Sequence, residues 1–267
     1  MSKKVVRLAV IGFCCTVLFP FAAYAGSPLF QNLSTSDYQS ALKDISSAWS
    51  YTSVSPASTL GHIFGFEIGV VAGGADTPKI NSLSQSAGAG SVPELPSGEI
   101  FGAITVPFGL TVEAEGLPKM TVAGVSANSE ALALKWTFSE LLPMLPLDLD
   151  AKAFYSNSGF NFDGTVSGVY TTFDLTDEMT GAEIEASKKF LFVEPYVKLG
   201  MLQARGKMDV TGSTQVFSTG VMSDTETVSG TEFMAGADLD FAVLRIGAEI
   251  GSVFGDTRAA AKLSLYF

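Results

Sequence analysis

The sequence predicts an all-β protein, a closed antiparallel transmembrane β-barrel of about ten strands preceded by a short amphipathic helix. Eight or twelve strands are the alternatives. Three observations lead to this prediction: an export signal at the N-terminus, a period of two in the apolar residues from residue 60 onward, and short connections that alternate with long ones. The expected organisation is a signal peptide at 1–25, an N-terminal helical extension or plug at 26–59, and the barrel at 60–267.

Composition narrows the function classes. The 267 residues include 27 acidic and 16 basic side chains, and the formal net charge is -11. Nucleic-acid binding needs clustered Lys and Arg to neutralise phosphates, so we expect no nucleic-acid partner. The chain has one His, and both cysteines, Cys14 and Cys15, lie in the predicted signal peptide. We therefore expect no disulfide, no metal and no cofactor.

The first 25 residues have the three parts of a secretory signal. A basic start is followed by an apolar stretch at 8–21, and Ala23-Tyr24-Ala25 supplies a small-x-small cleavage pattern. The apolar stretch is interrupted by Pro20 and is shorter than the roughly 20 residues that a spanning helix needs. We expect cleavage after Ala25 and no later transmembrane helix.

One helical pattern follows the signal. Tyr38, Leu42, Ile45 and Trp49 are spaced by three or four residues, which places them on one face of a helix over about 35–50. Ser34, three residues before Asp37, resembles a capping box at its start. Two interpretations remain open: a flap packed against the body, which we favour, and a plug in the mouth of a barrel.

From residue 60 the pattern changes to that of strands. In 132–138, for example, Leu132, Leu134, Trp136 and Phe138 alternate with small or polar residues. The predicted strands are 60–73, 99–106, 110–117, 130–139, 147–157, 172–189, 192–205, 231–241, 244–253 and 257–267. An even number of strands is typical of bacterial single-chain barrels.

The connections between these strands alternate in length. Those at 107–109, 140–146, 190–191 and 242–243 are short, whereas 74–98, 118–129, 158–171 and 206–230 are long and rich in Ser, Thr, Gly and Asp. If the last strand runs toward the periplasm, the short turns lie on that side and the long loops lie outside the cell. This asymmetry is typical of outer-membrane barrels, which have short periplasmic turns and longer extracellular loops.

A soluble β-sandwich also alternates apolar and polar residues, but two features argue against it. The first is that aromatic residues gather near the periplasmic strand ends, as in a membrane-interface girdle. They are Phe108, Trp136, Phe138, Phe190, Phe192, Phe241, Tyr266 and Phe267.

The second feature is the charge on the polar faces. Pairing each hairpin by its tightest register places opposite charges across from each other five times. The pairs are Lys135 with Asp150, Glu185 with Lys198, Lys189 with Glu194, Asp240 with Arg245, and Glu249 with Lys262. Because an unpaired charge in a narrow lumen is costly, this matching favours an inward polar face. Counted over all the predicted strands and not only these pairs, the inward faces hold more acidic than basic residues. This acidic excess would attract cations.

The C-terminal strand carries a specific resemblance. Leu263, Leu265 and Phe267 alternate up to a terminal aromatic residue, and together with the signal peptide and the amphipathic strands they resemble bacterial outer-membrane β-barrel proteins. No subfamily motif is present. The resemblance implies residence in the outer membrane of a Gram-negative-type bacterium, contact with outer-membrane lipid, and recognition of the last strand by the barrel assembly machinery.

The sequence offers little for catalysis. His62 is the only candidate base, and no serine motif lies near it. The acidic pairs Glu113/Glu115 and Asp148/Asp150 each point to one face of a strand, where lumen charge pairing is a better use than calcium binding. We therefore expect no enzyme.

The expected function is a small pore or transporter with an acidic, charge-paired lumen for a small cationic solute. One alternative is a channel for a hydrophobic solute gated by the N-terminal segment. Another is a structural or surface interaction protein that uses its long extracellular loops.

Overall fold

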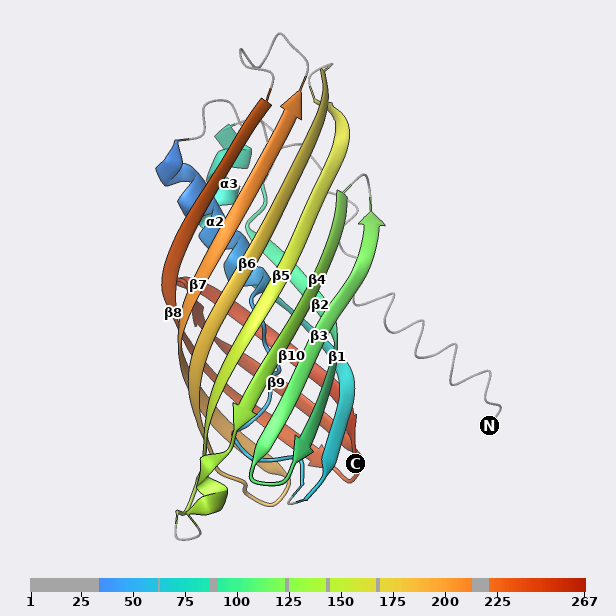
Figure 1. Ribbon diagram of the computed structural model, residues 1–267, viewed down its shortest axis with the longest axis vertical. Coiled ribbons are helices and arrows are strands. Elements are labelled where there is room, and N and C mark those ends of the chain that lie inside the picture. Colours follow the sequence, from blue (N-terminus) through green and yellow to red (C-terminus); the bar gives the residue numbers. More distant parts are fainter. Residues whose placement is uncertain are drawn as a thin grey trace, which may run out of the picture.

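The computed structural model describes residues 34–267 apart from 62, 87–90, 123–124, 143–144, 167–168 and 213–220. Ten antiparallel strands form a closed barrel in which each strand pairs with its neighbours in sequence and β1 pairs with β10 (Figure 1). The strands are β1 (Gly65–Asp76), β2 (Glu94–Val106), β3 (Leu110–Val122), β4 (Val125–Trp136), β5 (Asp148–Val166), β6 (Val169–Ser187), β7 (Val193–Gly212), β8 (Val221–Phe241), β9 (Leu244–Val253) and β10 (Asp256–Tyr266). The predicted fold is confirmed. The predicted signal peptide lies outside the described residues.

The helices are α2 (Thr35–Trp49), α3 (Pro78–Ser86) and the short 3-10 helix η2 (Phe138–Leu141). Helix α2 was predicted and begins as expected, because the Ser34 hydroxyl accepts a hydrogen bond of 3.1 Å from the Asp37 amide. Helix α3 was missed inside the predicted loop 74–98. Its signal in the sequence is Pro78 at the first helical position. None of the helices in the described ranges is long and apolar enough to cross a membrane.

Three strands, β5, β7 and β8, are much longer than the sequence predicted, and together with β6 they form a tall wall on one side of the barrel (Figure 1). The predicted long loops 118–129 and 158–171 are mostly strand, and the two hairpins pair as far as Val122 with Val125 and Val166 with Val169. Their Ser, Thr, Gly and Asp content is typical of loops, but the inward residues of the tall wall include Phe160, Leu175 and Met208, which pack against α2. The apolar partner that stabilises these strand extensions lies far away in the sequence.

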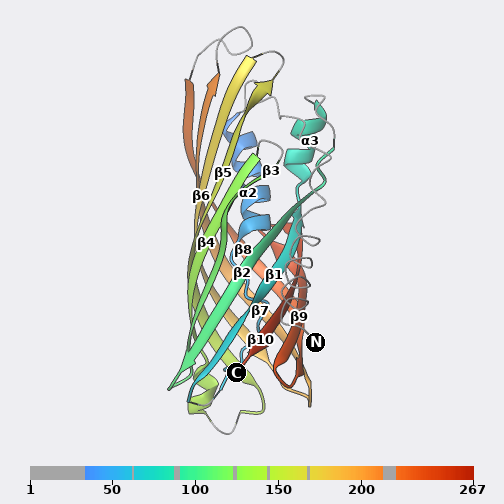
Figure 2. The same cartoon turned by 90° about the vertical axis from the view of Figure 1, so that its right-hand side faces the viewer.

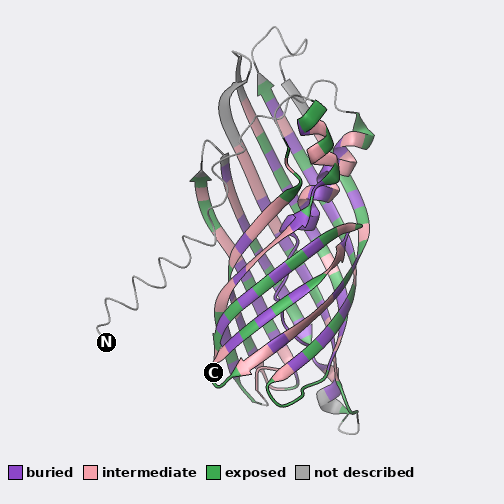
Figure 3. Cartoon of the chain, turned by 180° about the vertical axis from the view of Figure 1, so that it is seen from behind, coloured by how far each residue is buried: buried purple, intermediate pink, exposed green. Residues whose placement is uncertain are grey.

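The lower part of the barrel has the two faces of a transmembrane barrel. Burial alternates along each strand (Figure 3), with charged residues inside and large apolar residues exposed outside. The exposed belt includes Phe66, Ile68, Ile104, Leu132, Leu134, Ile184, Val197, Leu199, Phe233, Ile246, Ile250, Leu263 and Leu265. The predicted aromatic residues Phe108, Trp136, Phe190, Phe192, Phe241 and Phe267 are exposed at the end that carries the short turns and the C-terminus.

In the tall wall the outward face is polar and the inward face is apolar, the reverse of the lower barrel. Beyond Met201 on β7, the outward side chains become polar with Gln203, Arg205 and Lys207, while the inward positions hold Ala204 and Met208. Strand β8 does the same, with exposed Thr225, Thr227 and Ser229 around the buried Val228. The apolar belt therefore ends near Met201, and we place the wall above this level outside the membrane. Helix α2 lies against its apolar inner face (Figure 2).

Candidate functional site: a lumen filled by residues 50–58

Residues 50–58 follow α2 directly, and we call them the lumen segment. Residues 50 to 57 are buried. Four lysines from strands around the barrel donate hydrogen bonds to this segment. Lys135 of β4 donates to Pro56 O (2.9 Å), and Lys152 of β5 donates to Ser53 Oγ (3.0 Å). Lys198 of β7 donates to Thr52 Oγ1 (3.4 Å), and Lys262 of β10 donates to Ser55 Oγ (2.8 Å). A segment that contacts strands around the barrel lies inside the lumen.

The sequence left a flap and a plug open for the helix. Helix α2 packs against the inner face of the tall wall, and the segment that follows it occupies the lumen. The physical reason is hydrogen bonding. Serine and threonine hydroxyls and exposed carbonyls accept hydrogen bonds from lysines that would otherwise be buried without enough acceptors. Arg258 adds a further contact where the segment leaves α2, because its guanidinium donates to Ser50 O at 2.8 Å. Because strand pairing closes the barrel, these partners meet only in the tertiary structure.

The structure places seven of the eight predicted lumen charges in fully buried inward positions and Asp240 at the partly exposed mouth. The eight are Lys135, Asp150, Glu185, Lys198, Asp240, Arg245, Glu249 and Lys262. Two predicted cross-strand pairs are confirmed by the strand register, Glu185 opposite Lys198 and Asp240 opposite Arg245. In the second pair the Arg245 Nε lies 2.7 Å from the Asp240 carboxylate.

Two predicted pairs have the wrong register. Lys135 lies opposite Lys152 instead of Asp150, and Glu249 lies opposite Ala260 instead of Lys262. Both errors are slips of two residues, which keep each side chain on its predicted face. The first arises because helix η2 lengthens the connection between β4 and β5. The second arises because β9 and β10 join through a two-residue turn at Phe254 and Gly255, both with positive φ, a geometry typical of tight hairpins.

The fifth predicted pair, Lys189 opposite Glu194, keeps its predicted register next to the Phe190–Val193 bridge, but the two side chains bind other partners. Lys189 instead pairs with Asp240 at the periplasmic mouth. Glu194 accepts hydrogen bonds from Ser187 at 2.7 Å and from Ser58 at 3.0 Å. Ser58 of the lumen segment thus binds Glu194, for which the sequence predicted a lysine partner.

Each buried lysine in the middle of the lumen joins two carboxylates. Lys152 lies 3.1 Å from Glu185 and 3.5 Å from Glu113, and Lys262 lies 2.9 Å from Glu67 and 3.5 Å from Asp238. Lys198 lies 3.1 Å from Glu249 and 3.9 Å from Glu232. These networks and the lumen segment interlock, because Thr52 donates to Glu249 while it accepts from Lys198.

Buried carboxylates outnumber buried cations on the lower barrel wall. Ten carboxylates (Glu67, Glu113, Glu115, Asp150, Glu183, Glu185, Glu194, Glu232, Asp238 and Glu249) face six cations (Lys135, Lys152, Lys198, Arg245, Arg258 and Lys262). Within the described part of the chain, both carboxylate oxygens of Asp150 and of Glu183 lack a hydrogen-bond partner. This excess of carboxylates agrees in sign with the acidic lumen that the sequence predicts. The free-energy cost of burying an unpaired carboxylate is highest where water is excluded.

The acidic pairs from the sequence are used in different ways. Glu113 faces Lys135 and Lys152 and accepts from the Tyr51 hydroxyl, whereas Glu115 accepts the Thr52 amide at 3.2 Å. Asp148 is only partly buried at the mouth. Within the described ranges, no three His, Cys, Asp or Glu side chains are grouped to hold a metal ion. His62, the candidate base, lies outside the described residues.

Helix α3 caps the extracellular side of α2 through two contacts. Lys79 pairs with Asp37, and the Asp44 carboxylate accepts the Ile80 amide at 2.8 Å. Burial, with a smaller contribution from the carboxylate of Asp256, raises the pKa of Asp44 to about 6. The hydrogen bond from Lys79 lowers the pKa of Asp37, so this group titrates at lower pH than Asp44 does.

We expect the docking of α2 inside the barrel to weaken as the pH rises through about 6, because the charged Asp44 carboxylate is costly to bury. The folded state binds the Asp44 proton more tightly than the unfolded chain, so this contribution to stability is complete below the usual pKa of 3.8 and is lost above about 6. Hydrogen exchange at the amides of α2, corrected for its intrinsic pH dependence, measures the change. Asp44→Asn should remove it, and an unchanged pH dependence in this variant would contradict the assignment.

Residues 8–256 match the family model described as "Family of unknown function (DUF6588)". The chain belongs to this family. No curated protein matches the chain.

Solved structures of outer-membrane proteins are similar to part of this chain. The outer membrane protease OmpT from Escherichia coli is 11% identical with a TM-score of 0.45, and the match covers 76% of this chain and 96% of OmpT. The translocator domain of the autotransporter NalP from Neisseria meningitidis is 9% identical with a TM-score of 0.44, covering 78% and 89%. Ail of Yersinia pestis is 12% identical with a TM-score of 0.36, covering 76% and 97%.

Proposed function

We propose that this chain is an outer-membrane transport barrel that its own lumen segment closes at rest and that conducts small cations when this segment leaves. The occupied lumen is the observation that carries the proposal. The apolar belt and the aromatic residues at one end support a position in the membrane. In the closed state, residues 50–58 accept hydrogen bonds from the buried lysines of the lumen. These bonds stabilise the charged side chains where a continuous path of water is absent.

Charge supports the preference for cations. Removing the lumen segment leaves the ten buried carboxylates facing six cations, and an acidic lining concentrates cations in a water-filled pore. Barrel size supports a small conductance, since about eight strands enclose an interior that side chains can fill and sixteen or more leave a wide channel. Ten strands lie near the narrow end of this range.

Planar-bilayer recording tests the proposal. We expect the exported chain to be closed most of the time, and a variant without residues 26–57 to conduct steadily with a reversal potential on the cation side in a salt gradient. Glu183→Gln in the deletion variant should reduce the cation preference, because it removes a carboxylate that has no hydrogen-bond partner. Glu178→Gln, an exposed position on the outer wall, is the matched control. A silent deletion variant that inserts normally, or an anion preference, would overturn the proposal.

A further inference from the structure

The barrel wall is incomplete between β2 and β3. Their ladder ends at Ile100 opposite Gly116. Above this point residues 94–99 of β2 pair only with β1, and residues 117–122 of β3 pair only with β4, as far as the described residues show. The register of β3 shifts between Leu117 and Met120, and Pro118 within this bulge lacks an amide donor. Two strand edges thus separate toward the extracellular side, and we call this opening the wall gap.

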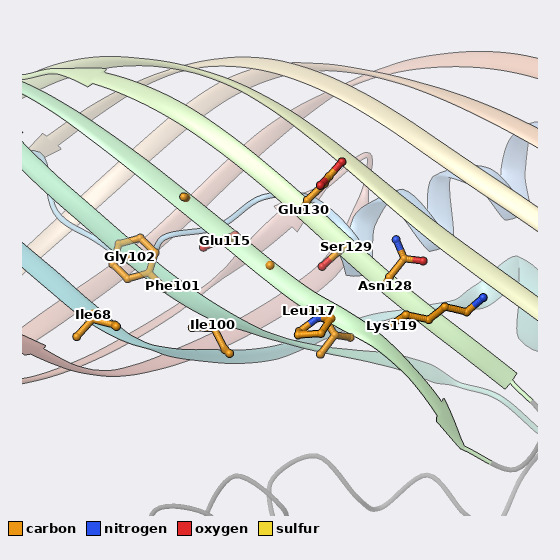
Figure 4. Close-up of a pocket in the computed structure, with 13 residues that line it drawn as sticks. Ile68, Ile100, Phe101, Gly102, Glu115, Leu117, Lys119, Asn128, Ser129 and Glu130 are labelled. Carbon is orange, nitrogen blue, oxygen red and sulfur yellow. The ribbon is translucent and has the colours of Figure 1, made fainter.

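A pocket of about 710 Å³ lies at the lower end of the wall gap (Figure 4). This volume is within the range of small-molecule sites. Ile68 and Ile100 line it from the apolar belt and are 55% and 54% exposed. Gly102 and Gly116 leave the floor of the pocket open. The nearest atom to an added Cβ would lie 3.9 Å away at Gly102 and 3.5 Å away at Gly116. The pocket therefore opens toward the lipid at the edge of the belt.

The inner side of the wall gap is closed by α2. Trp49, the last residue of the helix, packs with Leu95 of β2 and Leu117 of β3 in one apolar cluster. Its ring meets Phe160 edge to face at 5.0 Å. Leu117 also lines the pocket, so the pocket and the helix that precedes the lumen segment share a side chain.

The polar side chains that line the pocket include two carboxylates, Glu115 and Glu130, and one cation, Lys119. Glu115 lines the pocket, is 4% exposed, and has one oxygen without a hydrogen-bond partner. Glu99 accepts from the Ser129 hydroxyl beneath the gap. Among the described residues, neither Glu115 nor Glu99 lies within ion-pair distance of a cation. A buried acceptor left unsatisfied is costly, and a ligand that donates to it recovers that cost.

We propose that the wall gap binds a lipophilic amine from the outer leaflet of the membrane. The alkyl chain lies against Ile68, Ile100 and Leu117, and the ammonium donates to Glu115. The charge of the ammonium matches the two carboxylates, and the apolar lining matches the chain. This inference rests on the membrane position in the proposed function and does not depend on ion conduction.

Quenching of Trp49 fluorescence tests the inference. The chain has two tryptophans, so Trp136→Phe in the refolded full-length protein leaves Trp49 as the only reporter. The probe is dodecylamine brominated at its terminal carbon, and the brominated alcohol of the same length is the comparison. We expect saturable quenching by the amine, and about tenfold weaker binding of the amine in Glu115→Gln, the size expected when a charged hydrogen bond is lost.

Gly116→Leu fills the pocket from outside and should abolish saturable quenching, whereas Ala261→Leu, on the outward face of β10, should leave it unchanged. Equal quenching in these two variants, or equal affinity for amine and alcohol, would overturn the inference. Heat-modifiable gel mobility confirms insertion in each variant. If the site fails while the deletion variant still conducts cations, only this inference is lost; if the protein does not insert, the proposed function fails as well.

Discussion

Replacing Lys198 by methionine is expected to lower the free energy of unfolding by about 3–5 kcal/mol, the cost typical of removing one partner from a buried ion pair. The Lys198 ammonium lies 3.1 Å from Glu249 and 3.9 Å from Glu232, and all three side chains are buried. Without the lysine, two carboxylates stay inside the barrel with no cation within ion-pair distance on this side. Denaturant unfolding of the refolded protein in lipid vesicles measures the loss.

A matched control lies on the same strand. Lys207 and Asp209 form an ion pair of 2.8 Å on the part of β7 above the belt, but their side chains are 60% and 38% exposed. Water screens such a pair, so Lys207→Met should change stability by less than about 1 kcal/mol. Equal effects of the two substitutions would show that the Lys198 network is solvated and that the lumen is open.

A double-mutant cycle separates the register in the structure from the tightest register predicted from the sequence. Lys198→Met combined with Glu249→Gln should recover much of the single loss, because both charges leave together. The cycle for Glu249 with Lys262 should give a coupling within about 0.5 kcal/mol of zero, the usual error for independent sites. Lys262 instead contacts Glu67 and Asp238. A large coupling in the second cycle would favour the register we rejected.

Leu42→Ala is expected to release α2 from the tall wall and so to open the lumen more often. Leu42 is fully buried and packs into the space above Gly206, where a Cβ atom would lie 2.5 Å from its methyl group. Truncating a buried leucine costs about 2–5 kcal/mol. Since each 1.4 kcal/mol is about a tenfold change in an equilibrium, the undocked population should rise by at least about 30-fold.

Two measurements report this change. The amides of 38–48 should exchange hydrogen faster, and single-channel records of the full-length variant should show more frequent openings. Ser40→Ala on the same helix removes only an exposed hydroxyl contact with Ser36 O and serves as the control. Faster exchange without added openings would mean that α2 and residues 50–58 move independently, which would contradict gating by α2.

The helix and the strands were predictable because their signals are local. Tyr38, Leu42, Ile45 and Trp49 at helical spacing placed α2 to within a residue, and the period of two placed all ten strands. The same period assigned each lumen charge to the inward face, since a slip of two residues leaves the face unchanged. Cross-strand partners were less predictable, because register depends on turn geometry, as Phe254 and Gly255 show.

By itself, then, the sequence determined the barrel, its inward and outward faces and the helix before it, because periodicity records which face of an element is apolar. Only the tertiary structure decided that residues 50–58 occupy the lumen, that Lys198 pairs with Glu249, and that β2 and β3 part above Ile100. These features arise when segments far apart in the sequence compete for the same buried hydrogen bonds and the same space. That competition is settled by the geometry of the closed barrel, which leaves no periodic signal in the chain.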